Sequence, residues 1–155
     1  MKFDWTQGAL AEGLRLYQEG EFFAAHEAWE SVWLESQEPE KMFLQGLIQV
    51  TAAFHHLQRS NPLGTALLLK AALARLERYP AHFGGISVDV LCDDIREWLQ
   101  ALDAGAPALQ LSSAAYVLMC LAKAWSDRSA RVEDFSSLRE RRCDGRAASR
   151  IQDFR

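Results

Sequence analysis

The chain has 155 residues, enough for one domain with a substantial hydrophobic core. Hydrophobic residues make up 49% and charged residues 25%, as in an ordinary soluble globular protein. The formal net charge of -4 argues against general binding to nucleic acids, and no apolar run reaches the roughly 18 residues that a membrane span needs.

Glycine and proline divide the chain into helical segments, without strand-like alternation of useful length. The predicted helices run from about Trp5 to Gln18, Glu21 to Ser36, Pro39 to Arg59, Pro62 to Arg78, and Val88 to Leu102. Asn61 and Ser87 are predicted to cap the last two of these helices. Short connections imply antiparallel neighbours, so we predict an all-α, single compact antiparallel bundle of five to six helices.

The C-terminal part differs in composition from the rest. The segment "SSAAYVLMCLAKAW", residues 112–125, is predicted as an additional helix after a bundle domain over residues 1–111. Residues 126–155 hold 8 Arg and 6 acidic residues and few aliphatic ones, which is typical of a polar tail.

The cellular compartment is predicted from the cysteines and the N-terminus. Cys92, Cys120 and Cys143 are an odd, widely spaced set that fits neither a disulfide framework nor a zinc motif. The first residues, "MKFDWTQGAL", do not resemble a signal peptide. A cytoplasmic location is therefore expected.

The second predicted helix contains "FFAAHEAWESVW", in which His26 and Glu30 stand among aromatic residues. On a helical wheel, Trp33, Phe22 and Trp29 lie within about 60° of His26, and Glu30 lies on its other side. This pattern predicts that His26 and Glu30 point inward and that Glu27 lies at the boundary.

The third predicted helix carries a polar stripe made of Gln45, Gln49 and His56. Small residues, Gly46 and Ala53 among them, accompany the stripe and would let another helix approach closely. A buried carboxylate needs a partner, because without one it costs several kcal/mol or takes up a proton. We therefore predict that His26 and Glu30 face this stripe and form an internal polar cluster.

Three interpretations of the cluster stay open. It can be a hydrogen-bond network that fixes helix register in an interaction module without enzymatic activity. It can be a small-ligand or acid–base site, with His26, Glu30 and His56 as catalytic candidates and Glu27, Trp33, Gln45 and Gln49 as ligand-binding candidates. It can also hold a metal through His26, Glu30 and His56, although "HEAWE" lacks the second histidine of zinc proteases. No cofactor and no partner are identified by these residues.

A tetratricopeptide unit is a rival hypothesis from a different class. Gly20, Phe22, Ala25, Trp29 and Pro39 fit part of that pattern, but no second copy follows at the 34-residue period. A single unit cannot form the concave groove of such repeats.

Four ordered motifs resemble the domain of unknown function 309 family: "GEFFAAHEAWESVW", "FLQGLIQVTAAFHHLQRSN", "GTALLLKAALARLERYP" and "GGISVDVL". The resemblance covers about Tyr17 to Leu102. It picks out eight positions: His26, Glu27, Glu30, Trp33, Gln45, Gly46, Gln49 and His56. It implies an all-helical bundle, with a homo-oligomer as a candidate state. It implies no activity, since none is assigned to the family.

Overall fold

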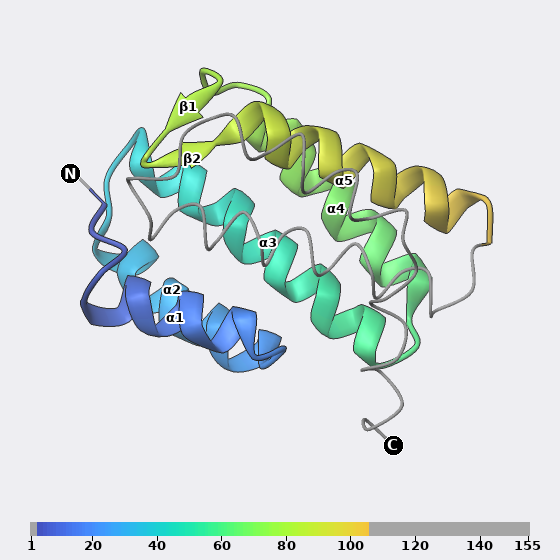
Figure 1. Ribbon diagram of the computed structural model, residues 1–155, viewed down its shortest axis with the longest axis horizontal. Coiled ribbons are helices and arrows are strands. Elements are labelled where there is room, and N and C mark those ends of the chain that lie inside the picture. Colours follow the sequence, from blue (N-terminus) through green and yellow to red (C-terminus); the bar gives the residue numbers. More distant parts are fainter. Residues whose placement is uncertain (1–2, 106–155) are drawn as a thin grey trace, which may run out of the picture.

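The computed structural model describes residues 3–105, which form five helices and a small hairpin (Figure 1). The helices are α1 (Gly8–Gln18), α2 (Phe22–Glu35), α3 (Glu40–Gln58), α4 (Pro62–Leu76) and α5 (Val88–Asp103). The prediction of an all-α bundle is confirmed. The helix and the polar tail that were predicted for residues 112–125 and 126–155 lie outside the described residues.

The first helix begins three residues later than predicted. The carboxylate of Asp4 accepts hydrogen bonds from the Thr6 backbone N–H at 3.0 Å and the Gln7 amide at 2.7 Å, which favours a turn before the helix. Trp5 is buried, and its indole N–H donates to the carbonyl oxygen of Gly84 at 2.8 Å. The segment before α1 is therefore fixed to the hairpin and does not continue the helix.

The hairpin was not predicted. Strands β1 (His82–Phe83) and β2 (Ile86–Ser87) pair antiparallel, and the turn between them needs Gly84 and Gly85, whose φ angles are 59° and 87°. At two residues each, the strands are too short for an alternating sequence pattern to appear.

The predicted side-chain cap is present at the start of α4 and absent at the start of α5. Asn61 caps α4 as predicted, because its side-chain oxygen accepts from the Gly64 N–H at 2.9 Å. Ser87 makes no capping bond to α5, so that prediction was wrong. The Ser87 hydroxyl lies 3.4 Å from Nδ1 of His82, its partner residue in the hairpin. Strand pairing thus turns this side chain away from the helix.

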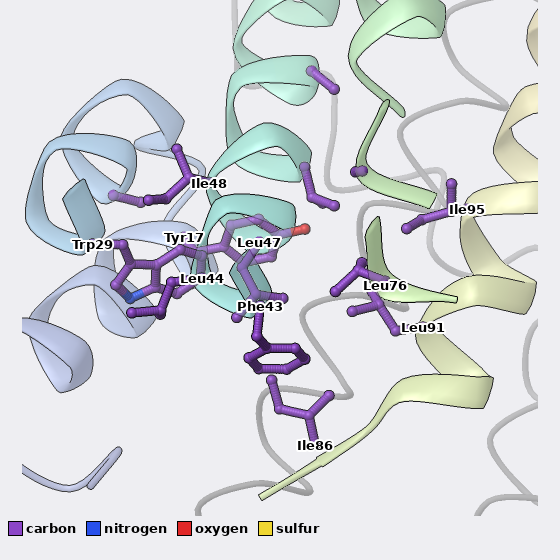
Figure 2. Packing of buried hydrophobic residues seen from close by; sticks show 14 of the residues in the cluster. Tyr17, Trp29, Phe43, Leu44, Leu47, Ile48, Leu76, Ile86, Leu91 and Ile95 are labelled. Carbon is purple, nitrogen blue, oxygen red and sulfur yellow. The ribbon is translucent and has the colours of Figure 1, made fainter. Parts of the chain in front are cut away.

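Helix α3 is the centre of the bundle. It packs against α2 on one side and α4 on the other, while α1 packs on α2 and α5 on α4. Figure 2 shows Leu44 and Ile48 of α3 on the side of Trp29, with Leu76 and Ile95 on the opposite side. The three helices α2, α3 and α4 therefore form one layer.

The two remaining helices cover the same side of this layer. The ring of Phe54 on α3 contacts Tyr17 of α1, with centroids 6.2 Å apart, and Trp98 of α5, with centroids 5.1 Å apart. In Figure 1, α1 overlaps α2 and α5 overlaps α4, which are the helices that they contact. The opposite side of the α2–α3–α4 layer is covered by no other element of residues 3–105, and we call it the outer face.

None of the helices between residues 3 and 105 is both long enough and apolar enough to cross a membrane.

Candidate functional site

The buried face of α2 is rotated away from His26. Its buried residues are Phe22, Ala25 and Trp29, at the three- and four-residue spacing of one helix face. The side chain of His26 is 29% exposed and that of Glu30 is 50% exposed. The prediction that both point inward was therefore wrong for Glu30, and His26 lies at the edge of the buried face.

The physical reason is the position of Phe23. The sequence pattern counted this aromatic residue as part of the buried face, which centred the face on His26. In the structure the Phe23 side chain is 56% exposed. Exposing Glu30 also avoids the cost of burying a carboxylate.

His26 and Glu30 interact only loosely. Nδ1 of His26 lies 4.0 Å from Oε2 of Glu30, which is too long for a hydrogen bond. The His26 Nδ1 atom is buried and has no hydrogen-bond partner among residues 3–105. These two side chains are neighbours on one helix, and within residues 3–105 no group from α3 forms a hydrogen bond or ion pair with either of them.

The polar stripe of α3 contacts α4, not α2. The amide oxygen of Gln49 accepts from the Arg75 guanidinium at 3.1 Å. Nδ1 of His56 lies 3.0 Å from the amide nitrogen of Asn61, in the turn before α4. Because the amide nitrogen can only donate, Nδ1 accepts, and the proton of the neutral ring is on Nε2.

The small residues beside this stripe explain why α4 takes that position. A Cβ atom at Gly46 would come within 2.8 Å of the Leu76 side chain, so glycine is what lets α3 and α4 approach so closely. Close approach of a helix was predicted, but the partner was expected to be α2. The pattern identifies a close contact without identifying the helix that makes it.

The remaining candidates are also surface residues. The ammonium group of Lys41 lies 4.6 Å from the centroid of the Trp33 ring, a cation–π contact between the end of α2 and the start of α3. Gln45 is half-buried and Glu27 is exposed. All seven candidates are at least partly exposed, and the contacts of Gln49, His56, Trp33 and the His26–Glu30 pair are separate from one another, so the expected internal cluster was wrong in its geometry. Their catalytic, ligand-binding and metal-binding roles stay predictions.

A continuous surface of aromatic and imidazole rings begins at Phe23. Its ring centroid is 6.4 Å from that of His26 and 5.5 Å from that of His55, which in turn is 6.3 Å from that of His56. His55 therefore links α2 to the end of α3. The surface continues to α4, where His56 contacts Asn61.

The exposed apolar side chains of the described chain are confined to two helices. The large hydrophobic residues with high exposure are Phe23 and Leu34 on α2, and Leu63 and Leu67 on α4. These two helices flank α3, and residues 3–105 place none of this kind on α1, α3 or α5. Exposed apolar side chains thus lie on both helices that form the edges of the outer face.

Comparison with known proteins identifies part of the chain. The family described as "Domain of unknown function (DUF309)" matches residues 10–68. Residues 10–68 are thus similar to the DUF309 family. An uncharacterized protein of Aquifex aeolicus (strain VF5) is 32% identical over 99 residues, which are 63% of this chain and 30% of that protein. The chain thus spans less than a third of this relative, and no solved structure matches it.

The DUF309 match includes α2, α3 and the first residues of α4. All seven candidate residues, and all four exposed hydrophobic residues on α2 and α4, fall within residues 10–68. Lys70, Arg75 and the whole of α5 lie beyond it.

Sequence reasoning missed the titratable groups that are buried. Tyr17 and Asp94 are 4% and 6% exposed, and burial together with the charge of Asp94 raises the pKa of Tyr17 well above its ordinary value. Asp94 lies between Leu91 and Ile95 and one turn before Trp98, all buried on α5. The wheel that placed those apolar residues on one face would also have placed Asp94 there.

The described residues do not provide a complete set of ligands for the metal site that was one of the hypotheses. Within residues 3–105, no group of three or more His, Cys, Asp or Glu side chains is arranged to hold a metal ion. His26 and Glu30 are one loose pair, and His56 is engaged with Asn61.

Proposed function

We propose that the DUF309-like part of this chain is a protein-interaction module whose binding surface is the outer face. The observation that carries this proposal is the distribution of exposed apolar side chains. Phe23, Leu34, Leu63 and Leu67 are 56–71% exposed and occur only on the two helices that border this face, within the described chain. Large exposed apolar groups gathered on one face are typical of an interaction surface.

The polar residues of this face suit binding better than acid–base chemistry. A catalytic acid and base must both reach one reacting group. Here Gln49 is held by Arg75, His56 by Asn61, and Trp33 contacts Lys41. Each of these groups is thus engaged with a neighbour, and the exposed apolar side chains lie on the two helices that flank them.

The Aquifex relative also supports a modular role. The matched residues make up 30% of that protein, so most of it lies outside the match. A domain within a longer chain is expected to bind a partner protein for that chain. The exposed apolar side chains of the outer face provide a surface for such binding.

A photo-crosslinking amino acid at position 67 tests the proposal in cells. We expect a defined adduct, identified by mass spectrometry, that disappears when Phe23→Asp is added on the same face. The matched control carries the crosslinker at Glu12, which is exposed on α1 on the other side of the layer. The proposal fails if position 67 gives no adduct beyond that of position 12, or if its adduct is unaffected by Phe23→Asp.

A further inference from the structure

We propose that the partner of the outer face presents an acidic helix, whose carboxylates bind three cationic side chains at one end of this face. These are Lys41, Arg75 and Arg78, and we call them the cationic cluster. The inference rests on the proposed function, because it names the chemistry of the partner for the same surface. It is carried by the uncharged groups that hold the three cations.

Two of the cations contact side chains that have no charge. The ammonium group of Lys41 lies 4.6 Å from the centroid of the Trp33 ring, and Nη1 of Arg78 lies 3.8 Å from the sulfur atom of Met42. Such contacts orient a cation without neutralising it. Within residues 3–105, neither Lys41 nor Arg78 forms an ion pair with a carboxylate. Both charges are therefore available to an anion from another molecule.

Arg75 is held in the same manner and keeps donors for a further partner. Its Nη1 atom donates to Oε1 of Gln49 and to the carbonyl oxygen of Ala71, both at 3.1 Å. Its Nε and Nη2 atoms donate no hydrogen bond to the part of the chain that the structure describes. Because a guanidinium has five N–H donors in a planar fork, the edge of Arg75 that is not used can bind a carboxylate with two hydrogen bonds.

Two other arginines of the described chain are neutralised by the chain itself. Arg15 on α1 forms ion pairs with two carboxylates of its own helix region, at 2.6 and 2.7 Å. Arg96 on α5 forms ion pairs with Glu77 and Asp93 at the same two distances. The cationic cluster differs, since its charges are ordered by uncharged groups. This arrangement is the one expected of a surface that is complementary to an anionic partner.

The groups that hold the two arginines lie on the outer face of α3. Met42 and Gln49 are seven residues apart, which is two helical turns and about 11 Å. Phe54, which contacts α1 and α5 on the other side of the layer, lies about 140° from Gln49 on the helical wheel. Arg75 lies on α4, and Arg78 follows the end of that helix. The cationic cluster therefore lies where α3 begins and α4 ends.

Acidic residues near this end are engaged outside the cationic cluster. Oε2 of Glu38 accepts from the backbone N–H of Met42 at 3.1 Å, in the first turn of α3. Oε1 of Glu77 accepts from Arg96 of α5 at 2.6 Å. Helix α4 itself contains neither Asp nor Glu. An acidic partner can therefore approach the cluster along α4 without meeting a carboxylate of that helix.

The spacing of the cluster suits a partner helix. Carboxylates seven residues apart on such a helix are separated by about 11 Å, as Met42 and Gln49 are. On α4, Leu67, Ala71 and Arg75 recur every four residues and so form one row. Leu67 is 60% exposed, which provides an apolar contact in the same row as a cation. An amphipathic helix with acidic and apolar side chains matches both features.

A nucleic acid matches this face less well than an acidic helix does. Helix α2, which forms the other edge of the outer face, contains three Glu residues and neither Lys nor Arg. The phosphates of a strand that crossed the face would meet these carboxylates. A helix that lies along α4 would not meet them.

The test measures binding of fluorescein-labelled helical peptides to the full chain by fluorescence anisotropy. The probe peptide carries leucines on one face and glutamates beside them, and the matched peptide has glutamine in place of each glutamate. We expect the glutamate peptide to bind at least about tenfold more tightly at low salt, with a smaller difference at high salt.

Charge reversals assign this binding to the cluster. Lys41→Glu and Arg78→Glu should each weaken binding of the glutamate peptide at least about tenfold and leave that of the glutamine peptide unchanged. Lys70→Glu is the matched control, because it makes the same change of charge on α4 at a position about 140° from Arg75 on the helical wheel. It should bind the glutamate peptide as the wild-type chain does. Circular dichroism establishes that each variant is folded.

Other outcomes overturn the inference. A glutamate peptide that does not bind, or binds no more tightly than the glutamine peptide, would exclude an acidic partner. Reversals in the cluster that weaken binding no more than Lys70→Glu does would place the peptide elsewhere. Tighter binding of a single-stranded RNA than of the glutamate peptide would assign the cluster to nucleic acid.

The crosslink at position 67 separates this inference from the proposed function. An adduct that survives Lys41→Glu and Arg78→Glu but is lost with Phe23→Asp would keep the outer face as a binding surface and exclude its acidic partner. The absence of any specific adduct at position 67 would remove the proposed function, and the inference with it.

Discussion

Burial raises the pKa of Tyr17 on α1, and the charge of Asp94 on α5 raises it further, although the two residues are far apart in the sequence. The Tyr17 hydroxyl has no hydrogen-bond partner among residues 3–105. Its ring packs against Phe22, Trp29 and Phe54. The aromatic ring therefore stabilises the core, whereas the hydroxyl group carries an uncompensated cost of desolvation.

The first prediction concerns alkaline unfolding. In the unfolded chain Tyr17 ionises near pH 10, whereas in the folded chain it stays protonated because its pKa is raised. The contribution of the protonated Tyr17 to the free energy of unfolding is thus fully present below pH 10. It is lost as the pH rises above 10 toward the pKa of Tyr17 in the folded chain. Tyr17→Phe should reduce the fall in stability above pH 10, and at pH 7 it should be neutral or stabilising by up to about 1 kcal/mol.

Urea unfolding of both proteins at pH 7 and above pH 10 measures this effect. Tyr79→Phe is a useful comparison, because the Tyr79 hydroxyl donates to the carbonyl oxygen of Pro39 at 2.6 Å. Losing that bond should destabilise the protein at pH 7. A Tyr17→Phe protein that loses more stability than Tyr79→Phe would contradict the assignment of an unsatisfied hydroxyl.

The second prediction separates the two bonds of Asn61, which caps α4 and contacts His56. Asn61→Ala should cost about 1 kcal/mol of unfolding free energy, because the Gly64 N–H loses its acceptor. Asn61→Asp keeps a capping oxygen and loses the amide donor to His56, so its cost should be smaller. Thermal unfolding of both variants decides the order, and an equal loss in the two would show that the cap contributes little.

The third prediction compares two leucines on α4. Leu69 is fully buried, whereas Leu67 is 60% exposed. Leu69→Ala should cost about 2–5 kcal/mol, because it leaves a cavity in the core. Leu67→Ala should change the stability of dilute protein by less than about 0.5 kcal/mol. Similar losses in the two variants would mean that the outer side of α4 is covered in the folded monomer.

The fourth prediction concerns Glu30. Within residues 3–105 its nearest ionisable partner is His26, whose Nδ1 lies 4.0 Å from Oε2 of Glu30, and half of its side chain is exposed. Exposed ion pairs are worth little, so Glu30→Gln should change the unfolding free energy of dilute protein by less than about 0.5 kcal/mol. Chemical denaturation measures this, and a loss above about 1 kcal/mol would indicate a buried, ionised Glu30, as the sequence analysis had expected.

The helices themselves could be predicted from local sequence. Asn61 and Pro62 predict the start of α4, and the apolar spacing from Val88 to Trp98 predicts the inner face of α5. These features depend on residues within one or two turns of each other, so the sequence alone contains them. The resemblance to the DUF309 family was also readable without a structure, and the family match over residues 10–68 includes the first two of its four motifs.

The surroundings of each face were decided by the tertiary structure. Helix α3 is apolar on several sides, and its sequence does not say that Gly46 meets α4 or that Phe54 is covered jointly by α1 and α5. Phe23 and Phe22 are chemically alike, yet one is 56% exposed and the other 6%. Which aromatic residue is buried depends on where the neighbouring helices lie. Local periodicity determines the helices and their candidate faces, whereas long-range packing selects the faces that are buried and, within residues 3–105, leaves the outer face uncovered.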